Sequence, residues 1–342
     1  MVLDKKCNNC GAKVVFNPKT QLLHCEYCKS DHPITEETEE QIKESSKDLD
    51  VYNCPSCGAQ IVCEPNTTST FCVYCKNTAI LKDKLKGEFF PQAIIPFQST
   101  KEEAIQAFED LKKGKKLIPD EFLDKKNIEE IKGVYIPFWF FDYVLDGHME
   151  AKAETDTSIR GSSTTTITTR EYSVIRSGSI SYNNIPIDGS THFQDNIMRS
   201  IEPFNYAGLK KYSSDYLSGF LSELYDVSKE QANEIAQTRA NNSAYELFYK
   251  SISEKNYDKI NVLNTKFNIV NSNVDYVLLP VWMLNVKYKD KFYTFAMNGQ
   301  TKKMIGNIPV DKAKATKYFL LMLLITTIIC ILIAVVIWKA VW

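Results

Sequence analysis

Two stretches of this sequence decide how the N-terminal part of the chain folds. Residues 7–28 read CNNCGAKVVFNPKTQLLHCEYC, and residues 54–75 read CPSCGAQIVCEPNTTSTFCVYC. Each stretch holds two C-x2-C pairs at the same spacing, offset by 47 residues, and the neighbouring residues match as well, which indicates an internal duplication. The candidate metal ligands are therefore Cys7, Cys10, Cys25, Cys28, Cys54, Cys57, Cys72 and Cys75.

The spacing within each stretch suits a closed metal site. A C-x2-C pair fits one tight turn that directs two thiolates at one ion, and Gly11 and Gly58 stand where that turn requires a positive φ. A short β-hairpin between the pairs brings four thiolates into a tetrahedron with no open position. We therefore predict two tandem β zinc ribbons, each with a structural Zn²⁺ that supplies most of its folding energy. Iron in a rubredoxin-like site uses similar turns and stays an alternative.

Charge and compartment limit what the ribbons can bind. Residues 1–9 are polar where a signal peptide needs an apolar core, so we expect the ten cysteines in a reducing cytosol, in metal sites instead of disulfides. Residues 1–35 carry five Lys against three acids, and residues 51–88 four Lys against three, with no Arg in either. The segment 36–50 carries seven acids and two Lys. This balance favours docking to proteins over binding nucleic acid, which needs clustered basic residues.

The C-terminal end predicts a membrane anchor. Residues 319–338 read FLLMLLITTIICILIAVVIW without a charge, and at ~1.5 Å per residue they span ~30 Å, the thickness of a bilayer core. A buried core helix is the alternative, but such helices are seldom apolar on all sides. Lys312, Lys314 and Lys317 precede the segment and Lys339 alone follows it, which predicts a single-pass protein of the cell membrane with a cytoplasmic N-terminus.

The rest of the sequence predicts one β-rich α+β cytoplasmic domain. We expect helices after the capping-box pairs Ser99/Glu102 and Ser228/Gln231, and a short helix from Pro119 to Ile131. A buried strand begins at Val134, several antiparallel strands follow to about residue 187, and Asn298-Gly299 predicts a hairpin. The expected boundaries are 1–35 for ribbon 1, 36–50 for an acidic, transiently helical linker that lets the ribbons move apart, 51–81 for ribbon 2, 82–88 for a linker, 89–310 for the α+β domain, 311–318 for a basic juxtamembrane segment, 319–338 for the membrane helix and 339–342 for an extracytoplasmic tail.

A weaker repeat joins two apolar stretches of this domain. VYIPFWFFDYVLDG (residues 134–147) resembles VLLPVWMLNVKYKD (residues 277–290), so that Trp139 aligns with Trp282. Two related halves, or one sheet built from paired strands, explain the repeat, and both Trp are expected in the core. The usual catalytic motifs are absent, and His148 and His192 have no evident nucleophile beside them. We therefore expect no catalytic residues, no bound organic cofactor and no enzymatic activity.

Several motifs together resemble one bacterial family. They are the duplicated CxxCG…CxYC ribbons, GVYIPFWFFD at residues 133–142, LPVWML at 279–284, MNGQT at 297–301 with GNIPV at 306–310, and the single C-terminal span. Nearly the whole chain resembles the YdjG-type family of zinc-ribbon membrane proteins found mainly in Firmicutes, whose members are often labelled as primosomal helicase-like or transcription-factor-type ribbon proteins. One departure is Lys302-Lys303, where the family pattern leads us to expect a Gly soon after MNGQT.

The resemblance implies a function that the residues alone do not. Relatives accompany a TPM-type membrane protein, an SPFH-type scaffold protein and a PspA-like protein, so the chain is expected to be a membrane-anchored adaptor that recruits cytosolic partners to a membrane-stress assembly. The alternative is a ribbon protein that binds nucleic acid while tethered to the membrane. It predicts salt-dependent DNA binding by residues 1–88, against which their nearly neutral charge argues.

Overall fold

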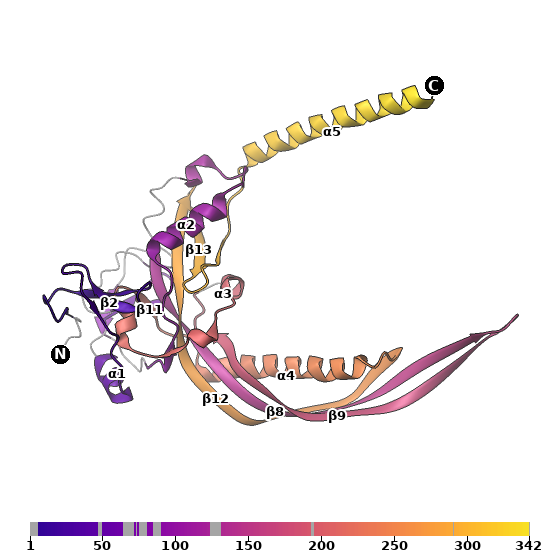
Figure 1. The fold of residues 1–342 in the computed structure, drawn as a ribbon, viewed down its shortest axis with the longest axis horizontal. Helices are drawn as coiled ribbons and strands as arrows, with labels where there is room; N and C mark the ends of the chain where they lie inside the picture. Colours follow the sequence, from indigo (N-terminus) through magenta and orange to yellow (C-terminus); the bar gives the residue numbers. More distant parts are fainter. Residues whose placement is uncertain are drawn as a thin grey trace.

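The computed structural model describes residues 6–46, 50–63, 72, 74, 81–84, 90–123, 131–192, 195–289 and 291–341. Figure 1 shows a central body from which two long parts project. One is helix α5 (Lys312–Val341), and the other is an arm built from strands β8 (Lys132–Arg160), β9 (Thr165–Asp188) and β12 (Lys259–Tyr288) with helix α4 (Lys229–Ser253) along it. The N-terminal ribbon lies on the body, on the side away from both projections.

Ribbon 1 is a separate three-stranded antiparallel sheet that is packed on the body. Its strands are β1 (Val14–Asn17), β2 (Leu22–Cys25) and β3 (Asp31–His32). The Phe16 amide donates to the Ser218 carbonyl at 3.0 Å, and the Phe16 ring meets Tyr216 edge-on at 5.3 Å between centroids. Because the side chain of Phe16 is buried in this contact, apolar burial helps to hold the ribbon on the body.

The described part of the acidic segment after ribbon 1 is packed on the body, whereas the sequence predicts a polar, transiently helical connector that lets the ribbons move apart. It contains helix α1 (Glu39–Ser46), and Ile42 on that helix is buried. The carboxylate of Glu37 accepts hydrogen bonds from the Ser214 amide at 3.0 Å and from its hydroxyl at 2.7 Å. Charge content alone suggested a solvated connector, but an acidic side chain can be buried when its oxygens are hydrogen-bonded.

Ribbon 2 is part of the main sheet. Its strands are β4 (Asp50–Asn53), β5 (Gln60–Cys63) and β6 (Leu81–Lys84), and β5 pairs antiparallel with β11 (Leu221–Glu223) of the body. Strand β6 also crosses the expected boundary between ribbon 2 and the linker that was placed at residues 82–88. The two copies of the duplicated sequence therefore join the rest of the protein in different ways.

The main sheet runs in the order β10-β7-β12-β8-β11-β5-β4-β6, with β9 on β8 and the β13–β14 pair on β12. The weak repeat is explained by one sheet with paired strands, because β8 and β12 are antiparallel neighbours and Val134 lies opposite Val281. Instead of several strands, residues 132–188 form one very long hairpin. The remaining strands are β7 (Ala93–Ile94), β10 (Lys210–Lys211), β13 (Lys291–Asn298) and β14 (Met304–Gly306).

Both aligned tryptophans belong to the core, as predicted. Trp139 and Trp282 are less than a tenth exposed. The Trp139 indole donates to the Val227 carbonyl at 2.9 Å, and that of Trp282 to the Ser99 hydroxyl at 3.0 Å. Buried indoles usually need such an acceptor, so the polar end of each ring is satisfied.

The helices begin close to their predicted positions, with one correction. Helix α2 (Lys101–Lys112) has its capping box at Thr100 and Glu103, one residue later than the predicted Ser99/Glu102 pair. The Ser99 hydroxyl donates to the Gly299 carbonyl instead, at 2.7 Å. The Ser228/Gln231 capping box of α4 is confirmed. The predicted helix from Pro119 is a 3₁₀ turn, η1 (Asp120–Leu123), and its continuation lies outside the described residues.

Three short helical segments complete the body. They are α3 (Asp195–Ile201), η3 (Tyr206–Gly208) and η4 (Ser214–Leu217). The predicted hairpin at Asn298 is confirmed as the β13–β14 pair, although its connection is longer than a two-residue turn. Lys302 has a φ of 63°, so a Lys holds the left-handed conformation near the point where a Gly was expected.

The arm is stabilised by α4, which covers one face of its sheet. Ala232, Ala236, Ala240 and Ala244 recur every fourth residue on α4 and are completely buried, so small side chains let the helix approach the strands closely. Farther out, the ring of Phe248 occupies the space above Gly147, where an added Cβ would lie 2.6 Å from the ring.

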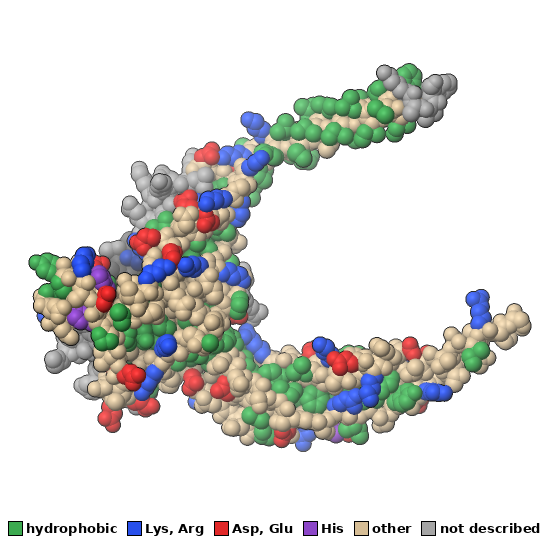
Figure 2. Space-filling model, in the orientation of Figure 1, with side chains coloured by type: hydrophobic (Ala, Val, Ile, Leu, Met, Phe, Trp, Pro, Cys, Tyr) green, Lys and Arg blue, Asp and Glu red, His purple; other side chains and the backbone are tan. Residues whose placement is uncertain are grey.

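Helix α5 contains the expected span. Residues 312–338 form a helix that is long and apolar enough to cross a membrane, and none of the apolar window is buried against the protein. Figure 2 shows its surface covered by apolar side chains. An exposed helix that is apolar on all sides needs a nonpolar environment other than the protein core, which favours the bilayer over the core-helix alternative.

Candidate metal centres

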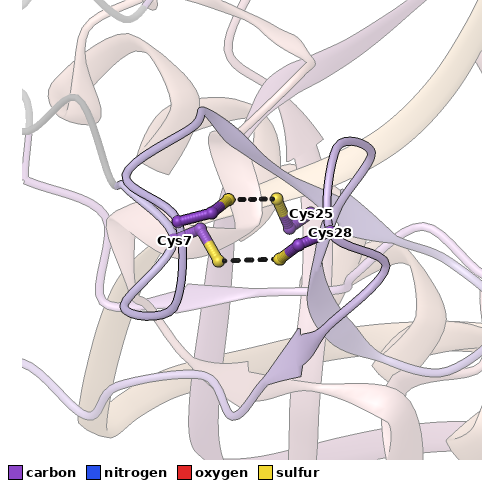
Figure 3. A group of neighbouring side chains, drawn as sticks. Cys7, Cys25 and Cys28 are labelled. Atoms are coloured by element: carbon purple, nitrogen blue, oxygen red, sulfur yellow. Dashed lines mark hydrogen bonds between the residues drawn. The ribbon is translucent and has the colours of Figure 1, made fainter.

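The first metal centre is formed by four cysteines from the two turns of ribbon 1. The sulfur atoms of Cys7, Cys10, Cys25 and Cys28 all lie within 4.8 Å of one another. Across the site the sulfur of Cys7 lies 3.4 Å from that of Cys28 (Figure 3), and the sulfur of Cys10 lies 3.5 Å from that of Cys25. Four sulfurs bound at ~2.3 Å from a tetrahedral centre would be about 3.8 Å apart. The cysteines are thus already spaced for such an ion.

The backbone of each turn explains why the sulfurs converge. The Gly11 amide donates to the Cys7 carbonyl at 2.8 Å with φ of 74° at Gly11, and the Lys29 amide donates to the Cys25 carbonyl at 2.8 Å with φ of 60° at Lys29. In ribbon 2 the Gly58 amide donates in the same way to Cys54, at 2.9 Å and with φ of 80°. The predicted positive φ at both glycines is confirmed.

Polar neighbours favour the thiolate form on one side of the first centre. The sulfur of Cys7 lies 3.2 Å from the Ser30 hydroxyl and 3.2 Å from Nε2 of His32. Hydrogen bonds from Ser30 chiefly, and from His32, lower the pKa of Cys7 to about 5, and Ser30 also lowers the pKa of Cys28. These groups surround the cysteines and support the ligand atoms without adding a ligand of their own.

Unlike those of Cys7 and Cys28, the pKa of Cys10 is raised. The Ala12 amide lowers its pKa, but burial and the three neighbouring thiols together raise it to about 12. Four thiolates this close repel one another without a cation between them, so a divalent ion that binds all four sulfurs would displace the remaining protons. The donor set fits zinc, which would add structural stability and, with four protein ligands, no exchangeable position.

The second centre is partly described. The sulfurs of Cys54, Cys57 and Cys72 also lie within 4.8 Å of one another, and Cys57 and Cys72 are 3.7 Å apart. The fourth predicted ligand, Cys75, lies outside the described residues. The two cysteine groups are consistent with zinc in both ribbons.

A polar cluster that was not predicted from the sequence connects ribbon 2 to the body. The carboxylate of Glu223 on β11 is completely buried and accepts hydrogen bonds from the Tyr74 hydroxyl and from the Ser190 hydroxyl at 2.8 Å. Nδ1 of His192 lies 3.0 Å from the same carboxylate, and its Nε2 donates to the Cys57 carbonyl at 3.2 Å. The cluster thus contacts both cysteine turns of ribbon 2.

The charges in this cluster depend on one another. The hydrogen bond to Glu223 raises the pKa of His192, which favours an imidazolium that donates from both nitrogens. Burial raises the pKa of Glu223 against three hydrogen bonds that lower it, and burial also raises the pKa of Tyr74. The Ser190 hydroxyl donates to the Glu223 carboxylate at 2.8 Å, and its oxygen also lies 3.4 Å from Nδ1 of His192.

The remaining histidines are not among the grouped candidate ligands: His32 lies beside Cys7, and His24 and His148 have other partners. His24 pairs with Asp31 across β2 and β3 at 2.6 Å, and His148 on the arm contacts Ser177 at 2.8 Å and Glu150 at 2.9 Å. Sequence reasoning missed His32, although its position four residues after Cys28 was a usable signal. It also missed the partner of His192, because Glu223 is 31 residues farther along the chain.

Comparison with known proteins shows which family this chain belongs to. The chain is 37% identical to a protein of Bacillus subtilis strain 168 named uncharacterized protein YdjG. The aligned region of 321 residues covers 93% of this chain and 94% of the Bacillus protein. The chain belongs to the YdjG family. The family resemblance inferred from the ribbons and the PFW, PVW and MNGQT motifs is thus confirmed. No family model and no solved structure matches, so the YdjG relationship is what these comparisons contribute.

Proposed function

We propose that the protein is a membrane-anchored adaptor, not an enzyme, whose first zinc ribbon docks cytosolic proteins. Helix α5 provides the anchor, and the lysines before the span favour a body on the cytoplasmic side. Closed cysteine sites supply rigidity without a reactive metal-bound water.

The observation that carries this proposal is the contrast between the matching tyrosines of the two ribbons. Tyr27 and Tyr74 hold the same place, between the cysteines of the second turn and 47 residues apart. Tyr74 is docked on the body, where it donates to Glu223 and its ring lies 5.5 Å from that of His192. Tyr27 is 82% exposed. The protein thus contains one ribbon already docked through this tyrosine and one whose tyrosine faces solvent.

An exposed tyrosine on a rigid turn is well suited to protein recognition. It offers a large apolar surface and one hydroxyl, and it loses little conformational entropy on binding. By analogy with ribbon 2, the surface that accepts Tyr27 would present an apolar pocket with a hydrogen-bond acceptor at its base. The family resemblance proposes SPFH-type and PspA-like proteins as cytosolic partners and a TPM-type protein in the membrane.

The test is affinity purification of the full-length chain from membranes, with metal analysis of the same sample. We expect zinc and an SPFH-type or PspA-like protein with the wild type, and loss of that protein with Tyr27→Ser while zinc is retained. Tyr245→Ser removes another exposed tyrosine, on α4, and serves as the matched control. Equal recovery with Tyr27→Ser would refute docking through ribbon 1. Salt-dependent capture of DNA by the wild type, with no protein partner, would favour the nucleic-acid alternative instead.

A further inference from the structure

A cavity of about 500 Å³ opens where helix α5 leaves the body. One wall is the loop after α2, residues 115–118, and the other is the segment between β14 and α5, residues 306–310. The walls are mostly apolar, with Leu117, Ile118 and Pro309 among them, and two exposed lysines, Lys115 and Lys116, also line the cavity. The cavity therefore joins an apolar interior to a cationic edge.

The two walls are held together by direct contacts at the start of α5. The Asp311 amide donates to the Leu117 carbonyl at 2.9 Å. The Lys314 ammonium donates to the Ile118 carbonyl at 2.9 Å and to the Asp120 carboxylate at 2.7 Å. Because these bonds connect the first turn of α5 to the loop, the cavity keeps a fixed position relative to the beginning of the span.

Part of the positive charge around the cavity is neutralised within the protein. Lys112 pairs with Glu109 at 2.8 Å, Lys113 pairs with Asp110, and Lys314 pairs with Asp120. Asp311 caps α5, accepting from the Ala313 and Lys314 amides. Around the cavity, the lysines that form no ion pair with a carboxylate of the described residues are Lys115, Lys116, Lys312 and Lys317. Figure 2 shows lysine side chains gathered where α5 leaves the body.

One contact places this charge at the level of the membrane surface. The ammonium of Lys116 lies 5.6 Å from the centre of the Tyr318 ring, and Tyr318 is the residue just before the apolar span. Tyrosines in this position lie among lipid headgroups, so Lys116 would stand at the depth of the lipid phosphates. The apolar walls of the cavity could then contact the glycerol and upper acyl region.

We propose that this cavity binds the headgroup of one anionic phospholipid, with Lys115 and Lys116 holding the phosphate. The inference rests on the membrane anchoring proposed above. Lysines next to a membrane span usually determine only which way the span is oriented, a role that suits Lys312, Lys314 and Lys317. Lys115 and Lys116 lie about 200 residues earlier in the sequence, outside the range of that effect, and yet the fold brings them to the same place.

The experiment uses the full-length chain purified in detergent and mixed with equal amounts of phosphatidylglycerol and phosphatidylcholine. Native mass spectrometry then counts the lipids that each protein retains. We expect the wild type to retain one phosphatidylglycerol in preference to phosphatidylcholine. The Lys115→Gln/Lys116→Gln double variant should lose this preference by on the order of tenfold, since each lysine near a lipid surface contributes measurably. Lys115→Arg/Lys116→Arg should keep it.

Controls separate this site from general charge and from the anchor itself. Lys250→Gln/Lys255→Gln removes two exposed lysines on the arm and should leave the preference unchanged. Equal retention of both lipids by the wild type, or an equal loss in the arm variant, would overturn the inference. So would displacement of phosphatidylglycerol by inorganic phosphate at the same concentration. If alkaline carbonate washes the wild type from membranes, the anchor proposal fails; if the chain stays without lipid preference, only this inference fails.

Discussion

Glu223→Gln tests whether the buried polar cluster holds ribbon 2 on the body. The carboxylate accepts from Tyr74 and Ser190 and pairs with His192 at 3.0 Å, all with Glu223 completely buried. A neutral amide keeps the shape, but it loses the ion pair and turns an NH₂ group toward donors. Breaking one side of a buried ion pair typically costs about 3–5 kcal/mol.

That loss should appear as local opening of ribbon 2. A cost of about 3 kcal/mol raises an opening equilibrium by on the order of a hundredfold. We therefore expect backbone amide exchange to accelerate by about that factor at Cys54, Gly58 and Leu224, whose hydrogen bonds lie within ribbon 2 or join it to β11. The measurement is hydrogen exchange on the full-length chain in detergent. Amides of ribbon 1 should exchange at their wild-type rate.

A surface control makes the result specific. Glu171→Gln removes an exposed pairing with Lys152 at 2.7 Å and should change exchange little, because exposed ion pairs contribute about 0–1 kcal/mol. If Glu223→Gln left the ribbon 2 amides unchanged, or if ribbon 1 opened equally, the cluster would not be the connection described above.

The metal content, the acid sensitivity and the arm provide further tests. Cys25→Ser removes one of four thiolates and should reduce zinc from about two ions to about one per chain, measured by mass spectrometry of the metal; loss of both ions would contradict independent sites. Hydrogen bonds from Lys19 and then Lys302 lower the pKa of Glu103 to about 2 from an ordinary 4.5, so its stabilisation is present above about pH 4.5 and is lost as the pH falls toward 2. The difference in unfolding free energy between wild type and Glu103→Gln should be below about 1 kcal/mol and should shrink over that range; a difference that grows with acid would reverse the argument. Phe248→Ala should destabilise the outer arm by about 3–5 kcal/mol, seen as faster proteolysis of β8 and β9, whereas unchanged cleavage would mean that α4 holds the arm without this ring.

The features that depend on local sequence were predictable. The cysteine spacing led to two groups of converging sulfurs, the uncharged run of residues 319–338 led to α5, and the Ser228/Gln231 pair led to the start of α4. Each of these follows from residues a few positions apart, where geometry along one turn or one helix is almost fixed. The cap of α2 was missed by one residue because Ser99 and Thr100 are both good caps and a distant acceptor, Gly299, takes the Ser99 hydroxyl.

The features that depend on distant contacts were not predictable. Ribbon 2 repeats the cysteine spacing of ribbon 1 and several neighbouring residues, and yet β5 joins β11 while ribbon 1 keeps its own sheet. Whether a strand edge stays open is decided by the partner that reaches it, and that partner is about 160 residues away. The burial of Glu37 and Glu223 has the same cause, since their hydrogen-bond partners come from other parts of the chain.

The pairing of β5 with β11 also determines where this protein can be cut. A truncation that keeps residues 89–310, the natural choice from the sequence, would remove β4, β5 and β6 together and leave β11 paired with β8 alone, with its other edge open. It would also remove the Tyr74 hydroxyl that donates to Glu223. The solvent-exposed carboxylate and the unpaired strand edge would then favour self-association. Removing ribbon 1 alone, by contrast, breaks no strand pair of the large sheet. Fragments for crystallisation or binding work should therefore begin before residue 50.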